Sequence, residues 1–143
     1  MTNRKGFTLI EILIVVAIIG LLSSIILVGL GSFNARARDT QRITDLRQTE
    51  AALALFYNAN QVYPPAGTWD VLTTALIGAT IGVTRVSNDP IPARTYWYGV
   101  SGDAQQYVVG ATLEDAGNRE LLTDLDGTVF TIACADPVYC TQI

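Results

Sequence analysis

Glu11 is the only charged residue in an apolar run that extends from Phe7 to Leu30. A charge deep in a hydrocarbon core costs about 2.5–3.5 kcal/mol, so such a residue usually has a partner and a function. One interpretation places Glu11 near a membrane interface, as in an isolated membrane anchor. In the other, the chain is cut after Gly6, and the new α-amino group of Phe7 lies four residues before Glu11 on the same helix face. Amine and carboxylate then neutralise each other within one chain or between adjacent chains.

The two cysteines of the chain, Cys134 and Cys140, are six residues apart. In an exported domain a nearby pair favours a disulfide, which contributes roughly 2–2.5 kcal/mol on the chain-entropy model. The alternative is two unrelated thiols. Zinc is disfavoured, because two cysteines in a chain without histidine do not supply four ligands unless carboxylates complete the site.

Acidic residues are concentrated between positions 114 and 126. Asp124 and Asp126 precede Gly127, and oxygen-rich loops of this kind suit calcium. The segment lacks the third acidic residue and the distal Glu of an EF-hand loop, so a solvated acidic loop is the simpler interpretation. No firm metal site and no other cofactor are predicted. The acidic residues are Glu114, Asp115, Glu120, Asp124 and Asp126.

The composition and motifs of the sequence argue against catalysis and against nucleic-acid binding. Histidine is absent, which removes the usual proton shuttle and the commonest metal ligand. Gly29-Leu30-Gly31 follows an apolar run rather than a strand, so it is no dinucleotide-binding fingerprint. The formal net charge is −4, and basic residues cluster nowhere beyond residues 36–47. The sequence therefore predicts a protein that is not an enzyme and binds no nucleic acid.

The apolar run that holds Glu11 is long enough to cross a membrane, since a helix needs about 20 apolar residues to span a bilayer. Arg4 and Lys5 precede it and place the N-terminus in the cytoplasm. We therefore predict a leader over residues 1–6 and a transmembrane helix over residues 7–33.

An ordinary signal peptide is the alternative for this segment. Its apolar core normally runs about 7–15 residues before a small-residue cleavage site. Such a site exists at residues 35–37, and cleavage there would release a soluble domain that begins near Arg38. The length of the apolar run and the carboxylate of Glu11 oppose this interpretation.

The helix continues beyond the apolar run as an amphipathic segment over residues 34–62. Residues 34–60 contain neither Pro nor Gly, and the helix should end by Tyr63 because two prolines follow. Arg42 is spaced to pair with Asp39 and with Asp45 along the helix. The predicted apolar stripe, which Glu50 interrupts, comprises Ile43, Leu46, Leu53 and Tyr57.

Basic residues at positions 36, 38, 42 and 47 lie on this amphipathic segment. They form either a collar that faces phospholipid or, as the simpler interpretation, a solvated helix surface near the membrane.

Residues 63–143 predict a small globular head. A short helix is expected at Thr68–Leu76, and three β-rich runs follow, with turn residues at 101–103 and at 126–127. Three strands are expected to form an antiparallel meander that covers one flank of the long helix. The predicted fold class of the head is therefore α+β, with one core. The aromatic residues 96–98 are interpreted as sheet packing rather than a ligand platform. The predicted strands are Thr95–Val100, Gln106–Leu113 and Thr128–Cys134.

The segment Lys5-Gly6-Phe7-Thr8-Leu9-Ile10-Glu11 resembles the class III signal of type IV pilins and type II secretion pseudopilins. That signal is a basic leader, then Gly, then Phe and an apolar helix with one Glu. The stretch from Asp45-Leu46 to Tyr63-Pro64 also resembles the major pseudopilin, in which a similar helix ends in a Tyr-Pro turn. The resemblance covers residues 1–64 in sequence and extends through the head only in architecture.

This resemblance implies that prepilin peptidase cuts after Gly6 and methylates the amine of Phe7. It implies that Glu11 pairs with the Phe7 amine of a neighbouring subunit. The expected fold is a long helix on a small antiparallel sheet, and the expected function is that of a structural subunit of a type IV pilus-like or type II secretion pseudopilus filament. The major pseudopilins also carry a calcium site in their C-terminal loops, but that loop pattern is not reproduced around Asp124 and Asp126.

The resemblance also implies the partners and the location of the chain. The partners are copies of itself, prepilin peptidase, an inner-membrane assembly platform and membrane lipid before assembly. The chain would cross the inner membrane once, with its N-terminus in the cytoplasm, and would then enter an extracytoplasmic filament. The alternative function is a permanently anchored extracytoplasmic receptor or binding domain.

One departure from the family concerns the Pro that many members carry about sixteen residues after the Glu. Residues 26–31 contain no Pro here. Gly29 and Gly31 each weaken a helix by about 1 kcal/mol relative to Ala, so they offer another flexible point.

Overall fold

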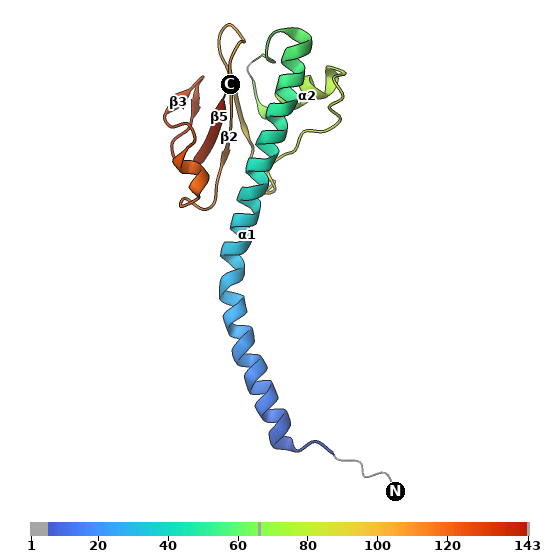
Figure 1. Ribbon diagram of the computed structural model, residues 1–143, viewed down its shortest axis with the longest axis vertical. Helices are drawn as coiled ribbons and strands as arrows, with labels where there is room; N and C mark the ends of the chain where they lie inside the picture. Colours follow the sequence, from blue (N-terminus) through green and yellow to red (C-terminus); the bar gives the residue numbers. More distant parts are fainter. Residues whose placement is uncertain (1–5, 66, 143) are drawn as a thin grey trace. The chain divides into compact units, whose positions relative to one another are not determined.

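The computed structural model describes residues 6–65 and 67–142, apart from the side chains of residues 25–30. The chain divides into two compact units, Met1–Asn34 and Ala35–Ile143. Helix α1 (Leu9–Asn60) contributes to both units, whereas the other elements described belong to the second (Figure 1). Of the predicted leader, only Gly6 lies within the described residues.

The N-terminal unit consists of a short non-helical segment, residues 6–8, and the first part of α1. Its side chains are mostly apolar and exposed. The hydroxyls of Ser23 and Ser24 donate hydrogen bonds to the backbone carbonyls of Ile19 and Leu21, at 2.7 and 2.8 Å. These polar groups are therefore satisfied within the helix itself.

Within the described residues, no helix is both long and apolar enough to cross a membrane. The predicted transmembrane segment, residues 7–33, includes residues 25–30, whose side chains lie outside the described part. The flexible point predicted around Gly29 falls in the same stretch.

In the second unit, α1 ends at Asn60, so the amphipathic segment stops slightly before the predicted residue 62. Gln61 follows with a φ of 61°, the left-handed conformation common just beyond helix ends. Its N–H donates to the carbonyl of Tyr57 at 2.7 Å. The prediction that the helix ends by Tyr63 is confirmed.

The apolar stripe of α1 is confirmed as the helix's contribution to the core. Ile43, Leu46 and Leu53 are buried, and Tyr57 is half-buried and packs on Tyr63 with ring centroids 4.8 Å apart. A second helix, α2 (Trp69–Gly78), adds Trp69, Leu72 and Leu76 to the same core. Thr68 caps α2 by accepting a hydrogen bond from the N–H of Val71.

The main sheet has the strand order β1-β2-β5 and is antiparallel throughout, with strands β1 (Trp97–Val100), β2 (Tyr107–Thr112) and β5 (Val138–Gln142). Every residue from Tyr107 to Ala111 is buried, because the central strand β2 is covered on both faces. Tyr107, Val109 and Ala111 belong to the core shared with α1 and α2, whereas Val108 faces a second cluster around the cysteines. This alternation is that of a strand between two apolar layers.

The predicted third strand, Thr128–Cys134, is wrong. That segment forms a separate two-stranded hairpin, β3 (Thr128–Val129) and β4 (Ile132–Ala133), and β5 takes the third place in the main sheet. Phe130 and Thr131 connect the hairpin with φ values of 43° and 73°. Two-residue turns with positive φ at both positions normally use Asn or Gly, so Phe-Thr carries no turn signal. A short 3-10 helix, η1 (Arg119–Leu122), lies between β2 and the hairpin.

Candidate functional site

Glu11 accepts hydrogen bonds from both the backbone N–H and the hydroxyl of Thr8, each at 2.7 Å to Oε2. The N–H of Glu11 in turn donates to Oγ1 of Thr8 at 3.4 Å. This reciprocal arrangement is a capping box at the start of α1, and it gives the carboxylate a partner within its own chain. The spacing Thr-x-x-Glu was visible in the sequence but was not used to predict it.

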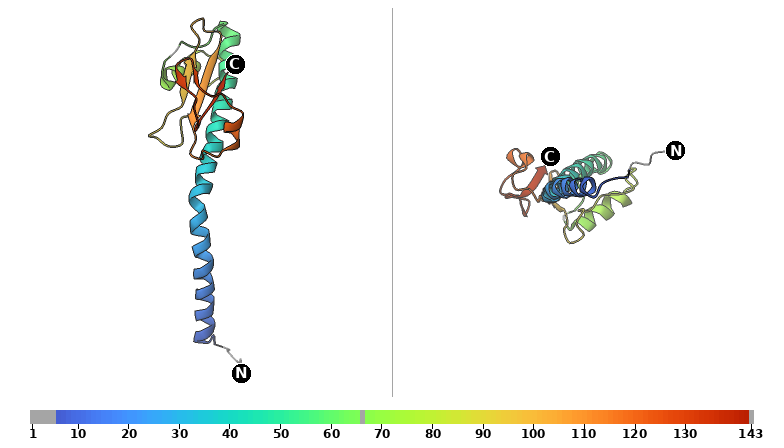
Figure 2. Two further views of the ribbon diagram at one scale, coloured as in Figure 1. Left: turned by 90° about the vertical axis from the view of Figure 1, so that its left-hand side faces the viewer. Right: turned by 90° about the horizontal axis from the view of Figure 1, so that it is seen from below.

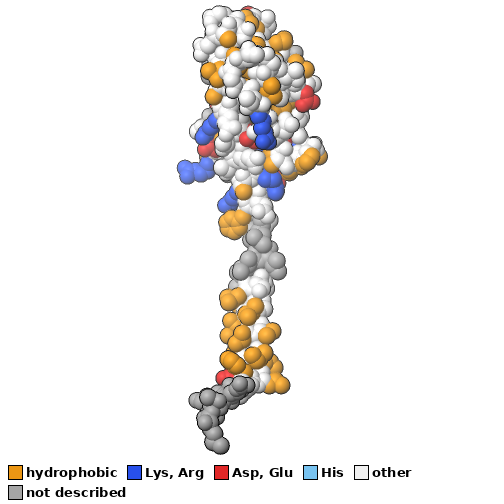
Figure 3. All heavy atoms as spheres, turned by 90° about the vertical axis from the view of Figure 1, so that its right-hand side faces the viewer, with side chains coloured by type: hydrophobic (Ala, Val, Ile, Leu, Met, Phe, Trp, Pro, Cys, Tyr) orange, Lys and Arg blue, Asp and Glu red, His pale blue; other side chains and the backbone are white. Residues whose placement is uncertain are grey.

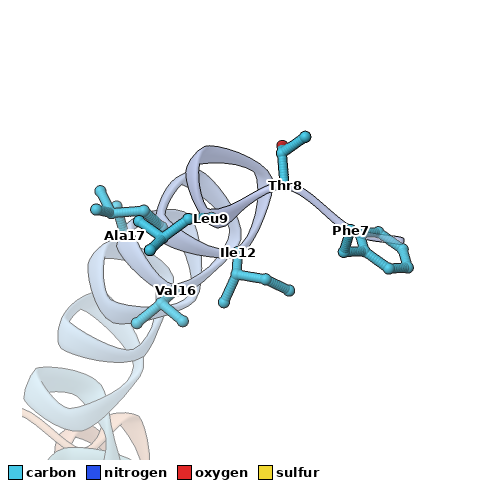
Figure 4. Close-up of a pocket in the computed structure, with 7 residues that line it drawn as sticks. Phe7, Thr8, Leu9, Ile12, Val16 and Ala17 are labelled. Atoms are coloured by element: carbon cyan, nitrogen blue, oxygen red, sulfur yellow. The ribbon is translucent and has the colours of Figure 1, made fainter. Parts of the chain in front are cut away.

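Gly6 and Phe7 lie just before the helix and are exposed. Phe7 is 84% exposed, and its ring lies apart from the helix beyond Thr8 (Figure 4). Together with apolar side chains of the first turns it borders a shallow apolar surface, whose other members are Leu9, Ile12, Leu13, Val16 and Ala17.

Arg42 is the centre of a buried ion-pair network in the second unit. Its side chain is fully buried. Nε and Nη2 donate to the two oxygens of Asp89, at 2.7 and 3.0 Å, in a bidentate pair. Nη1 donates to Asp39 and to Glu114, both at 2.8 Å. Bidentate pairs of this kind combine strength with a fixed geometry.

Two further groups complete the network. Asp39 accepts hydrogen bonds from the backbone N–H groups of Glu114 and Asp115, at 2.9 Å each. Arg38 forms a second bidentate pair with Glu114, at 2.7 and 2.6 Å. The hydrogen bonds from Arg38 lower the pKa of Glu114 to about 2, with Arg42 acting in the same direction. Burial works to raise the pKa of Asp89, but the bonds from Arg42 lower it below its ordinary value.

The predicted solvated surface holds for Arg36 and Arg47, whose side chains are 69% and 62% exposed, but not for Arg42. Arg42 is buried, and Arg36 and Arg47 pair with Asp115 and Glu120 at 3.2 Å. The same contacts correct the interpretation of the acidic segment, in which Glu114, Asp115 and Glu120 face α1 instead of forming a free loop. The partners are more than seventy positions apart in sequence, which hid the pairing.

The predicted pairing of Arg42 with Asp39 is confirmed, whereas the one with Asp45 is wrong. Asp45 instead accepts a hydrogen bond from the hydroxyl of Tyr96 at 2.8 Å. Burial and this bond raise the pKa of Tyr96 well above its ordinary value. Tyr96 and Tyr98 are buried in the core, so their interpretation as sheet packing is confirmed, and Trp97 is exposed between them.

Asp124 and Asp126 lie beside a third carboxylate, that of Asp136, which the sequence analysis missed. One carboxylate oxygen from each lies within 4.8 Å of the others. Oδ2 of Asp124 accepts from the N–H of Cys140 at 2.9 Å, whereas Oδ1 is buried with no partner among the described residues. Burial raises the pKa of Asp124, and the charges of Asp136 and Asp126 raise it further. This donor set fits a hard, oxygen-seeking cation such as calcium.

The predicted disulfide between Cys134 and Cys140 is confirmed. Both residues are buried in the second apolar cluster. Gly110 pairs with Cys140 across β2 and β5, and a Cβ at Gly110 would lie 3.0 Å from the cysteine sulfur. The disulfide therefore leaves little room for a side chain at this position of β2.

A long N-terminal helix packed on a small antiparallel sheet is the fold of a type IV pilin. The prokaryotic N-terminal methylation motif matches residues 1–27. The chain is 36% identical over 64 residues to the type II secretion system core protein G of Vibrio cholerae, which covers 45% of this chain and 44% of that protein. It is 29% identical over 122 residues to a type IV major pilin protein of Neisseria gonorrhoeae, which covers 83% and 66% of the two chains.

A core protein G of Klebsiella pneumoniae is 31% identical over 90 residues, which covers 63% of this chain and 62% of that protein. No solved structure matches the chain significantly. The alignment with the Vibrio protein spans less than half of that relative's length. The matched motif and these similarities support the superfamily of type IV pilins and type II secretion pseudopilins.

Proposed function

We propose that this chain is a structural, non-enzymatic subunit of a type IV pilus-like or type II secretion pseudopilus filament. The observation that carries the proposal is the exposed apolar surface of the N-terminal unit (Figure 3). Side chains this apolar are not left in water, and packing against other copies buries them. Among the most exposed are Leu9 at 82%, Ile10 at 65%, Val16 at 62% and Leu21 at 65%.

We propose that the bond between Gly6 and Phe7 is cut by prepilin peptidase and that the new amine of Phe7 is methylated. The match to the methylation motif supports this step. These two residues are exposed and lie outside the helix, which also supports it, because a peptidase needs an accessible and non-helical segment. The Thr8 cap keeps the helix from including the bond.

We propose that Glu11 then changes partner. In the free chain its carboxylate is occupied by Thr8. In the filament the amine of Phe7 from a neighbouring copy would take the place of these neutral donors, and a charged donor binds a carboxylate more strongly. Loss of one partner from such a buried pair typically costs about 3–5 kcal/mol.

We propose that the subunit is held by membrane lipid in the inner membrane before assembly, with its N-terminus in the cytoplasm. An inner-membrane assembly platform would then transfer it into an extracytoplasmic filament. The named relatives include both pilins and secretion core proteins, so the proposal covers both kinds of filament.

We further propose that Asp124, Asp126 and Asp136 bind a calcium ion. The support is the convergence of three carboxylates and the buried oxygen of Asp124 that lacks a partner. A bound cation would neutralise the mutual repulsion of these groups and fix the end of the chain around the disulfide.

The test of the filament proposal uses the full chain expressed in a bacterium with its assembly system. Intact-mass measurement should show loss of residues 1–6 and gain of one methyl group, whereas an uncut chain would support the anchored receptor. Glu11→Leu should leave processing intact and stop filament growth. Glu50→Leu, a matched substitution in the second unit, should leave it unchanged. Normal filaments from Glu11→Leu would contradict the assigned role of this carboxylate.

A further inference from the structure

Two dissimilar surface features lie on opposite sides of the second unit. One is a groove between the start of α2 and strand β1, and the other is η1. Figures 1 and 2 show α2 and η1 on different sides of α1. A helical polymer needs such a pair, since a heterologous contact joins two different patches of the same chain.

The groove is aromatic and open. It has a volume of about 480 Å³ and is lined by Trp69, Trp97 and Ile132 among others. Trp97, one of the residues that line it, is 43% exposed. Asp70 lies on its rim, exposed and without an ion pair among the residues that the structure describes.

Helix η1 carries an exposed apolar side chain and a cation, which complement the aromatic groove and its carboxylate. Leu122 is 81% exposed, although it is a large apolar residue in an ordered turn. Arg119, at the start of η1, is exposed and has no carboxylate partner in the described part of the chain. By contrast, Leu121 of the same turn is buried, so the turn fixes the direction in which Leu122 projects.

We propose that Leu122 of one copy inserts into the groove beside Trp97 of the next copy, with Arg119 paired to Asp70. The inference rests on the proposed filament, which brings heads of identical chains together. The two surfaces complement each other in two ways. The apolar side chain of Leu122 suits the aromatic groove, and the positive charge of Arg119 suits the negative charge of Asp70. A well-packed aromatic site with an adjacent Arg is the usual composition of an energetic hot spot.

The test is cysteine cross-linking in filaments of the full chain. A chain carrying both Leu122→Cys and Trp97→Cys should form a covalent ladder of oligomers on oxidation. Cys at position 122 of each copy would bond to Cys at position 97 of the next copy, so the links continue along the filament. Either substitution alone should give no ladder. The control chain combines Leu122→Cys with Leu55→Cys, a similarly exposed position on α1, and its ladder yield should be at least about tenfold lower.

Filaments that form from the doubly substituted chain without a ladder would overturn the inference, as would an equal ladder in the control. Dimers from Leu122→Cys alone would show a symmetric contact and would overturn it too. Absence of filaments from the unmodified chain would instead refute the proposed function. The two failures are therefore distinguishable.

The charge pair gives a second measurement. Arg119→Asp should reduce the ladder yield of the doubly substituted chain, and adding Asp70→Arg should restore it. The fluorescence of Trp69, which is buried beside Asp70, reports whether α2 remains folded. A ladder yield that does not respond to Arg119→Asp would overturn the assigned pairing.

Discussion

Replacing Arg42 should unfold the second unit more readily than any other single charge removal on α1. The change Arg42→Met keeps the length of the aliphatic chain and removes the guanidinium. Its bonds to Asp39, Asp89 and Glu114 are all lost at once. Three segments that are far apart in sequence then lose the group that joins them.

The magnitude follows from burial. The side chains of Asp39 and Asp89 are 0% and 1% exposed, so both carboxylates remain in the interior without their cation. Breaking a buried ion pair by removing one partner costs about 3–5 kcal/mol of unfolding free energy. Arg47→Met is the matched control, because Arg47 and Glu120 are 62% and 45% exposed. Exposed pairs are worth about 0–1 kcal/mol.

The assay is equilibrium urea unfolding of the full chain in detergent, followed by tryptophan fluorescence. Of the two tryptophans, Trp69 is buried and donates its indole N–H to the carbonyl of Ser87, so its emission should change on unfolding. Arg42→Lys should lie between Arg42→Met and the unmodified chain, because an ammonium keeps the charge and loses the bidentate geometry. A loss below about 1 kcal/mol for Arg42→Met, equal to that of Arg47→Met, would refute the reasoning.

Three further predictions concern the head. Because Arg38 depresses the pKa of folded Glu114 to about 2, this group contributes stability above the unfolded pKa, and the contribution is lost as pH falls towards 2. The acid unfolding profile of Glu114→Gln should be flatter over that range, and an unchanged profile would contradict this. Gly110→Ala should lower the unfolding free energy by about 1–3 kcal/mol through its clash with the disulfide. Gly102→Ala, with open space around it, should not. Calcium should raise the melting temperature of the unmodified chain but not of Asp136→Asn, and equal shifts would exclude the proposed site.

Local information was sufficient for the long helix. Its composition predicts a helix through residue 62, close to the observed end at Asn60, and the prolines after Tyr63 set its limit. The capping box of Thr8 and Glu11 was also encoded locally. The disulfide followed from a short spacing. Two of the three strands of the main sheet followed from β-rich runs separated by turn residues.

The separate hairpin of β3 and β4 contains a turn that local rules do not anticipate. Phe130 and Thr131 adopt positive φ because the hairpin folds over the sheet, where the carbonyl of Phe130 approaches Gly99. A Cβ at Gly99 would lie 2.8 Å from that carbonyl oxygen. The conformation is therefore imposed by packing between segments and not by the preference of either turn residue.

The sequence by itself determined the kind of protein: an apolar N-terminal helix with one carboxylate, a processing motif before it and a small head with a cysteine pair. These features are local patterns of residue type and spacing. Only the tertiary structure decided the partners of the charges, which placed Arg42 in the interior with Asp89 and Glu114, and Asp136 beside Asp124. The physical reason is that a charge acts on whatever lies within a few ångströms in space, and in this head those neighbours come from distant parts of the chain.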